Sequence, residues 1–135
     1  MRSLKALFSH PENNDTLVRY GFGQLSDGQK MLVALYSLLA LSGNRRLSLF
    51  IDEPDNFVSP REIQPWLAEL EERCGEKLEQ AVIISHNPIS IDYMAGASGR
   101  WFSRDEQGPV RVMNSPEQLV DGLALSELVA RGWER

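Results

Sequence analysis

The chain has 135 residues, 42% of them hydrophobic, enough for one compact domain or a portion of a larger one. Its net charge of −5 excludes a generally basic surface for nucleic acids or anionic membranes, and its one cysteine excludes an internal disulfide. No signal peptide opens the chain, and the longest apolar run, residues 31–41, is shorter than the roughly 20 residues that span a bilayer. We therefore expect a soluble, cytoplasmic protein that does not enter the membrane.

The first half of the chain predicts a loop, a long apolar helix and a strand. Residues 9–16 are polar and contain a proline and two asparagines, which predicts a loop. Residues 28–41 are apolar at helical spacing and also on the opposite side, so we expect a deeply buried helix. Residues 47–51 are an apolar run that ends at Asp-Glu-Pro, which predicts a short buried strand.

The next segment predicts a helix, a second strand and a further helix. Residues 59–62, Ser-Pro-Arg-Glu, have the spacing of an N-cap, a first-turn proline and a capping box. Cys74 falls on the apolar stripe of this helix, which indicates packing. Residues 81–84 predict another buried strand, and Asn-Pro at 87–88 predicts the start of the next helix. Two apolar strands separated by a helix predict a parallel βαβ unit.

The last third predicts a hairpin followed by helices. Residues 100–103 and 110–113 flank a turn-like sequence and predict two antiparallel strands. Ser-Pro at 115–116 predicts a helix start, and residues 123–133 predict a final helix. This segment carries no motif with a known chemistry.

Polar side chains follow both predicted parallel strands at the point where each ends. Asp52 and Glu53 end the first strand, and Ser85 and His86 end the second. Open α/β sheets bind ligands beside the carboxyl ends of their strands. A turn at the first strand or a loop histidine at the second is unremarkable alone, but their coincidence at matching ends predicts one functional site.

A polar stretch, Ser26-Asp27-Gly28-Gln29, precedes the long apolar helix. Ser26 and Gln29 have the spacing of a capping box, which is a sufficient structural reason for the pattern. The same geometry presents backbone N–H groups and a hydroxyl at the positive end of the helix dipole, which suits an anion. Gly28 would let a phosphate approach the backbone closely. A helix cap and a phosphate site therefore both remain open for this stretch.

Three motifs in this order resemble those of ABC-type ATPases. "LSDGQ" is similar to the family's signature, "LSLFIDEP" to its Walker B strand and "VIISHNP" to its switch-histidine loop. The match covers residues 22–94, about half of the chain, and the ordered trio is far more specific than any one motif. The resemblance implies an α/β fold: the C-terminal part of a P-loop NTPase with a parallel βαβ core, then a hairpin and helices. It also implies ATP hydrolysis at a dimer interface.

The resemblance implies that one group of residues acts across the dimer. Ser26 and Gly28 would contact the γ-phosphate of a nucleotide held by the partner subunit, with Gln29 beside them in the nucleotide site. Asn56 and its neighbours would form the D-loop, which crosses to the partner. A homodimer closed on nucleotide is therefore the assembly that the resemblance implies.

The resemblance assigns the chemistry itself to three other residues. Asp52 would support Mg²⁺ through water, Glu53 would orient and polarise the attacking water, and His86 would sense the γ-phosphate. These assignments suit phosphoryl transfer, which relies mainly on positioning and charge stabilisation. ATP and Mg²⁺ are thus the expected cofactors of the intact protein.

The residues after the motifs favour a soluble branch of this family. Transporter subunits usually carry a basic helix after the signature and a Ser-Ala-Leu-Asp D-loop, whereas this chain reads "KMLVALYSLL" and "DNFVSP". These sequences resemble the branch that contains RecF, SMC and OLD-type "AAA" ATPases. Residues 57–59 depart from the Gly-Leu-His common in that branch. The resemblance therefore supports the Walker B assignment but does not extend to the contact of the D-loop with the partner.

No Walker A motif occurs in the sequence. A P-loop needs G-x-x-x-x-G-K-[ST] to wrap phosphates, and the chain has no Gly-Lys pair. In the family this motif lies upstream of the signature. We therefore expect one partial domain that is inactive alone and needs an N-terminal Walker A lobe. It would comprise a lead-in at 1–21, the motif core at 22–95 and the C-terminal hairpin and helices at 96–135.

Other functions stay open beside the ATPase. A non-catalytic protein-interaction module could retain this fold, and a transporter nucleotide-binding subunit is a third candidate. Soluble relatives act in DNA repair, chromosome organisation and phage defence. The acidic balance of this segment gives no support for DNA contact, so DNA remains a partner of the whole protein at most.

Overall fold

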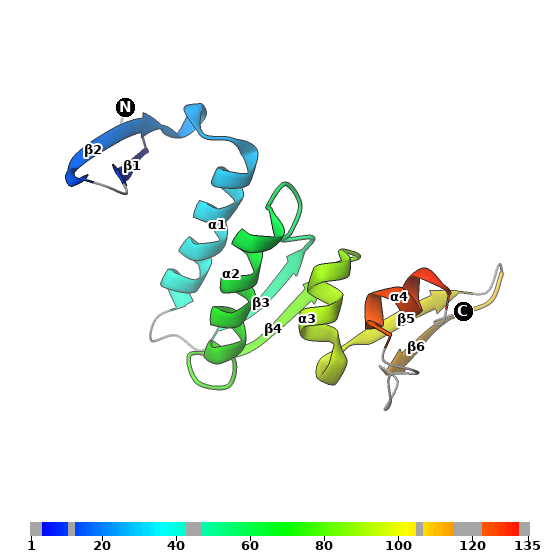
Figure 1. The fold of residues 1–135 in the computed structure, drawn as a ribbon. Coiled ribbons are helices and arrows are strands. Elements are labelled where there is room, and N and C mark those ends of the chain that lie inside the picture. The colour runs from blue at the N-terminus through cyan, green and yellow to red at the C-terminus, as the bar shows by residue number, and fades with distance from the viewer. Residues whose placement is uncertain (1–3, 11–12, 43–46, 105–106, 115–122, 133–135) are drawn as a thin grey trace.

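The computed structural model describes residues 4–10, 13–42, 47–104, 107–114 and 123–132. Figure 1 shows an elongated arrangement, with a hairpin at the N-terminal end, a central helix-and-sheet unit, and a second hairpin with a short helix at the C-terminal end. In chain order the elements are β1 Lys5–His10, β2 Asn13–Gly21, η1 Phe22–Gln24, α1 Asp27–Ser42, β3 Leu47–Asp52, α2 Pro60–Arg73, β4 Leu78–Ile84, α3 Pro88–Ser98, β5 Arg100–Arg104, β6 Val110–Asn114 and α4 Leu125–Ala130.

The centre of the fold is a parallel pair of strands, β3 and β4, connected through α2. Phe50 lies opposite Val82, and Asp52 lies opposite Ile84. Parallel neighbours need a crossover connection, which here is the helix. The predicted βαβ unit and α/β class are confirmed, and the two strands end at the same edge of the sheet.

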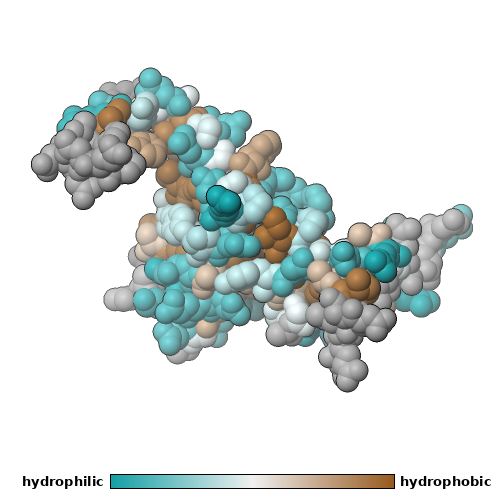
Figure 2. Space-filling view, in the orientation of Figure 1, coloured by the Kyte–Doolittle hydropathy of each residue, from teal (hydrophilic) through white to brown (hydrophobic). Residues whose placement is uncertain are grey.

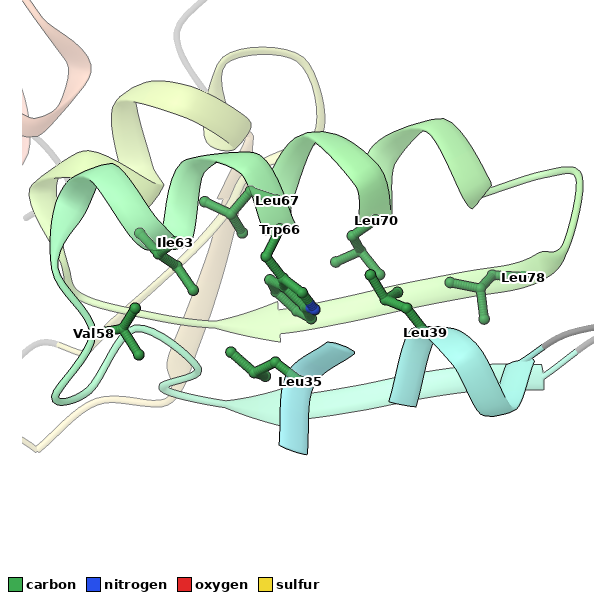
Figure 3. Close-up of a cluster of buried hydrophobic side chains, with 8 residues drawn as sticks. All are labelled: Leu35, Leu39, Val58, Ile63, Trp66, Leu67, Leu70 and Leu78. Atoms are coloured by element: carbon green, nitrogen blue, oxygen red, sulfur yellow. The ribbon is translucent and has the colours of Figure 1, made fainter. Parts of the chain in front are cut away.

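The main core lies between α2, α1 and one face of this sheet (Figure 3). Trp66 and Leu70 of α2 are fully buried, and Leu35 and Leu39 of α1 pack against them. Each such side chain contributes about 1.5–3 kcal/mol through burial. Cys74 is partly buried against the same core, as predicted, and burial raises the pKa of its thiol.

The predictions of a deeply buried first helix and of two buried strands are wrong for this chain. Tyr36 and Leu41 of α1 are exposed, and on the sheet Phe50 is 71% and Ile84 61% exposed. The reason is that α1 and α2 cover only one face of the sheet, and no described element covers the other. In Figure 2 brown hydrophobic patches accordingly interrupt the hydrophilic surface over α1.

The predicted loop at residues 9–16 is also wrong for residues 9–10 and 13–16, which are strands, and residues 11–12 lie outside the described residues. β1 and β2 form an antiparallel pair in which Phe8 lies opposite Val18, and the pairing continues with a register shift to His10 opposite Asn13. The hydrogen bonds between the two strands join backbone groups and do not depend on the side chains. Once the neighbouring apolar residues set the register, the pairing therefore continues through the polar residues. The lead-in segment is therefore a hairpin.

Local end signals of the helices are confirmed. The carboxylate of Glu62 accepts hydrogen bonds from the backbone N–H (3.4 Å) and hydroxyl (2.6 Å) of Ser59 at the start of α2. Asn87 Oδ1 accepts from the N–H of Ile89 at 2.9 Å at the start of α3. Such caps satisfy N–H groups that lack partners in the first turn.

The C-terminal part agrees partly with its prediction. β5 and β6 form the expected hairpin, whereas the last helix spans only Leu125–Ala130 within the described residues. Asp92 of α3 joins it by accepting from the N–H (2.8 Å) and hydroxyl (2.7 Å) of Ser126. The helix start predicted at 115–116 lies outside the described residues. No helix in the described ranges has the length and apolar character to cross a membrane.

Candidate nucleotide site

Glu53, His86 and Asn56 come together beyond the carboxyl ends of β3 and β4. His86 Nδ1 lies 2.9 Å from Glu53 Oε1, and Asn56 Nδ2 donates a hydrogen bond of 2.5 Å to Glu53 Oε2. The predicted proximity of the first strand's carboxylate to the second strand's histidine is therefore confirmed. Asn56 contacts Glu53 of its own chain, a contact the sequence analysis did not anticipate.

The backbone of Glu53 has an unusual conformation. Its φ is 47°, in the left-handed region that side-chain-bearing residues enter at a cost of roughly 1–2 kcal/mol. The N–H of Glu53 donates to the carbonyl of Ile84 at 2.8 Å, and its own carbonyl accepts from the N–H of Asn56 at 3.1 Å. These bonds fix the turn to the end of β4 and hold Glu53 beside the histidine loop.

Asp52, the predicted magnesium residue, is the last residue of β3 and is exposed. Mg²⁺ is commonly held by one or two carboxylates together with water and substrate phosphates. The described residues contain no cluster of three or more acidic, histidine or cysteine side chains that could hold a metal ion by themselves. Asp52 therefore fits an ion whose other ligands come from water and phosphate, and not an all-protein cage.

The polar stretch before α1 forms the predicted capping box. The N–H of Ser26 donates to Gln29 Oε1 at 3.0 Å, and the N–H of Gln29 donates to Ser26 Oγ at 3.2 Å. Both residues are exposed at the start of the helix. The cap is thus real, and it leaves Ser26 and Gln29 at the surface.

Gly28 has a structural reason that the sequence analysis missed. A Cβ at this position would lie 2.4 Å from the backbone oxygen of Phe57, in the loop between β3 and α2. The start of α1 therefore packs against the segment that follows Glu53, as the green loop beside α1 in Figure 1 shows. Within the described part of the chain, no hydrogen bond joins Ser26 or Gln29 to Glu53 or His86.

Gly28→Ala should destabilise the chain although alanine is the better helix former. The new methyl group would meet a backbone oxygen, which cannot rotate away, and overpacking costs about 1–3 kcal/mol. The helix preference of alanine recovers at most about 1 kcal/mol. We expect a net loss of up to about 2 kcal/mol in the free energy of unfolding, measured by urea denaturation with circular dichroism.

Gly23→Ala is the matched control, since a Cβ at Gly23 meets no atom within 4 Å. This variant should keep its unfolding midpoint. Equal or greater stability of Gly28→Ala would show that the approach of Phe57 does not require glycine.

A buried carboxylate, Asp55, was not anticipated from the sequence. Its oxygen Oδ2 accepts hydrogen bonds from Ser85 Oγ at 2.7 Å and Ser90 Oγ at 2.5 Å. An aspartate in a polar turn gives no periodic signal that separates a buried residue from a solvated one. The burial of Asp55 becomes apparent only in the structure, where the turn after β3 lies against the loop after β4.

Comparisons with known proteins identify the family to which this fold belongs. The parallel βαβ unit is that of an α/β, P-loop NTPase-like fragment. The family model described as "AAA domain, putative AbiEii toxin, Type IV TA system" matches residues 7–92, and the chain belongs to this family of ATPase-type domains.

One curated relative matches a large part of the chain. It is described as a "Putative ABC transporter ATP-binding protein", from Caldanaerobacter subterraneus subsp. tengcongensis, and is 27% identical over 116 residues. The alignment covers 80% of this chain and 45% of the relative, so the chain spans less than half the length of that protein. No solved structure matches.

Proposed function

We propose that this chain is the C-terminal part of a soluble ATPase that hydrolyses ATP between two copies of its nucleotide-binding unit. The observation that carries the proposal is the contact between Glu53 and His86 at the carboxyl ends of two parallel strands. The membership in an ATPase-type family supports it. The homodimer, the soluble branch and the residue roles are parts of this proposal.

Glu53 is the proposed base that orients and polarises the attacking water. Its two oxygens already contact His86 and Asn56, but each carboxylate oxygen has two acceptor sites. Glu53 can therefore take a water while it keeps its neighbours. In this proposal His86 contacts the γ-phosphate, Asp52 supports Mg²⁺ through water, and bound Mg²⁺ supplies positive charge to the phosphates.

Ser26 is the proposed donor to the γ-phosphate held by the other copy. Its oxygen accepts from the N–H of Gln29, and no described residue receives its hydroxyl proton. A serine that accepts as a cap retains one proton to donate. The cap and the phosphate contact are thus compatible, and Gly28 is the second residue proposed to contact that γ-phosphate.

The open apolar faces support a missing lobe. Phe50 and Ile84 on the uncovered face of the sheet, and Tyr36 and Leu41 on α1, are exposed in this chain. Contiguous exposed apolar surface marks an interaction site in a stable protein. We propose that the N-terminal lobe of the ATPase covers these faces and supplies the P-loop. This agrees with the part-length match to the curated relative.

The test compares this chain with the assembled ATPase, meaning this chain together with the segment that supplies the P-loop. The chain alone should show no saturable ATP binding by calorimetry at millimolar nucleotide, because it lacks the loop that wraps the phosphates. The assembled ATPase should bind and hydrolyse ATP. Micromolar binding by the chain alone, or no hydrolysis by the assembly, would contradict the proposal.

A second candidate is a non-catalytic protein-interaction module. Phe57 favours it, because this aromatic side chain is 77% exposed on the turn beside the site. The same comparison separates the two functions, since a module without catalysis would assemble and leave ATP intact.

A further inference from the structure

Asp55 ties the turn after β3 to the loop that carries His86. The residue is only 5% exposed, and no ion pair of the described residues includes it. Its contacts are hydroxyl groups: Ser85, directly after β4, and Ser90, in the first turn of α3, both donate to Oδ2. A buried carboxylate is costly unless it is hydrogen-bonded, so these two bonds define its place.

The direction of these hydrogen bonds fixes the backbone around His86. A carboxylate only accepts, so the proton of Ser85 is directed to Asp55. The oxygen of Ser85 in turn accepts from the N–H of Asn87 at 3.0 Å. The residues before and after His86 are therefore held by one chain of hydrogen bonds that ends on Asp55.

Packing does not hold the imidazole of His86. Its side chain is 82% exposed, and the ring contacts the Glu53 carboxylate through Nδ1. The position of this ring therefore depends on the backbone of its loop. Asp55 and Glu53 belong to the same turn, so the hydrogen bonds that Asp55 accepts fix the histidine loop relative to the carboxylate that His86 contacts.

We propose that Asp55 is a positioning residue that holds His86 against Glu53 through Ser85. This inference rests on the proposed ATPase function and names a determinant of that same site. Asp55 itself touches neither water nor phosphate in this account. Its effect on turnover passes entirely through the loop after β4.

The geometry supplies a matched set of variants. Both serines donate to one oxygen, so Asp55→Asn can keep both hydrogen bonds through its amide oxygen, whereas Asp55→Leu keeps neither. Ser85→Ala removes the link to the histidine loop. Ser90→Ala removes the other hydroxyl from the same acceptor but keeps the link through Ser85, so it is the matched variant, and its effect on His86 should be smaller than that of Ser85→Ala.

In the assembled ATPase, Asp55→Leu and Ser85→Ala should lower kcat by about 10–100-fold, the loss typical when a partner that orients a metal-binding side chain is removed. KM for ATP should change much less, and Asp55→Asn should restore most of kcat. The double variant Asp55→Leu/His86→Ala should be little worse than His86→Ala, because both changes remove one function. Losses that multiply, or an unaffected kcat in Asp55→Leu, would overturn the proposal.

A second measurement needs no nucleotide. The chain has two histidines, so His86 can be assigned by NMR with a variant of His10. Asp55→Leu and Ser85→Ala should shift the ring resonances of His86 and speed amide exchange at Asn87, and Ser90→Ala, which keeps the Ser85 link, should change both less. Unchanged spectra of folded Asp55→Leu and Ser85→Ala would overturn the positioning role. If the assembly hydrolyses no ATP, the proposed function fails and these spectra alone decide the role of Asp55.

Discussion

Glu53→Gln in the assembled ATPase is expected to keep ATP binding and to lose nearly all turnover. Glutamine preserves the size of the side chain and one oxygen for Asn56, but it lacks the charge that polarises water. Loss of a general base typically lowers the rate by about 10²–10⁴-fold. Phosphate release at saturating ATP measures the loss, and calorimetry measures the retained binding.

The variant should also accumulate as an ATP-bound dimer, visible by size-exclusion chromatography with light scattering. Glu76→Gln, the same exchange at an exposed position after α2, is the control and should leave turnover unchanged. Wild-type turnover in Glu53→Gln would reduce Glu53 to a strand-end turn residue.

Ser26→Arg should leave the subunit folded and able to bind ATP through its own P-loop, but it should prevent closure of the dimer. The long cationic side chain would occupy the place proposed for the partner's phosphate. Loss of the cap costs about 0.5–2 kcal/mol of stability and does not depend on nucleotide. ATPase activity and ATP-dependent dimerisation are therefore the measurements that distinguish a phosphate site from a cap.

Ser26→Ala is the matched variant, because it loses the same cap hydrogen bond without adding bulk. It should lose similar stability and retain far more dimerisation than Ser26→Arg. If both variants are less stable but dimerise normally, and Ser26→Arg hydrolyses ATP at the normal rate, the stretch before α1 is only a helix cap.

Features encoded by neighbouring residues could be predicted from the sequence. The residues of each capping pair lie three positions apart, so the pairs can be recognised from the local sequence. They are Ser26 with Gln29 and Ser59 with Glu62. The parallel unit follows from two apolar runs on either side of an amphipathic helix. The meeting of Glu53 with His86 then follows, because parallel strands end at one edge.

Features that depend on distant contacts could not be predicted. The carbonyl of Phe57 lies so close to Gly28 that only glycine fits there. The buried carboxylate of Asp55 is hydrogen-bonded by Ser85 and Ser90, which lie 30 and 35 residues further along the chain. The polar end of β2 is a strand because its backbone pairs with β1. The apolar residues of the helix and the strands predict surfaces that are covered in the complete assembly. They do not reveal whether this chain itself contains the segment that covers them.

Mixing Ser26→Arg and Glu53→Gln forms of the assembled ATPase tests the central claim most directly. Each form should be inactive alone. In a mixed dimer, one site combines an intact Glu53 from one subunit with an intact Ser26 from the other, so part of the activity should return. No return of phosphate release, with heterodimers shown to form, would contradict an ATPase whose site is shared between two copies.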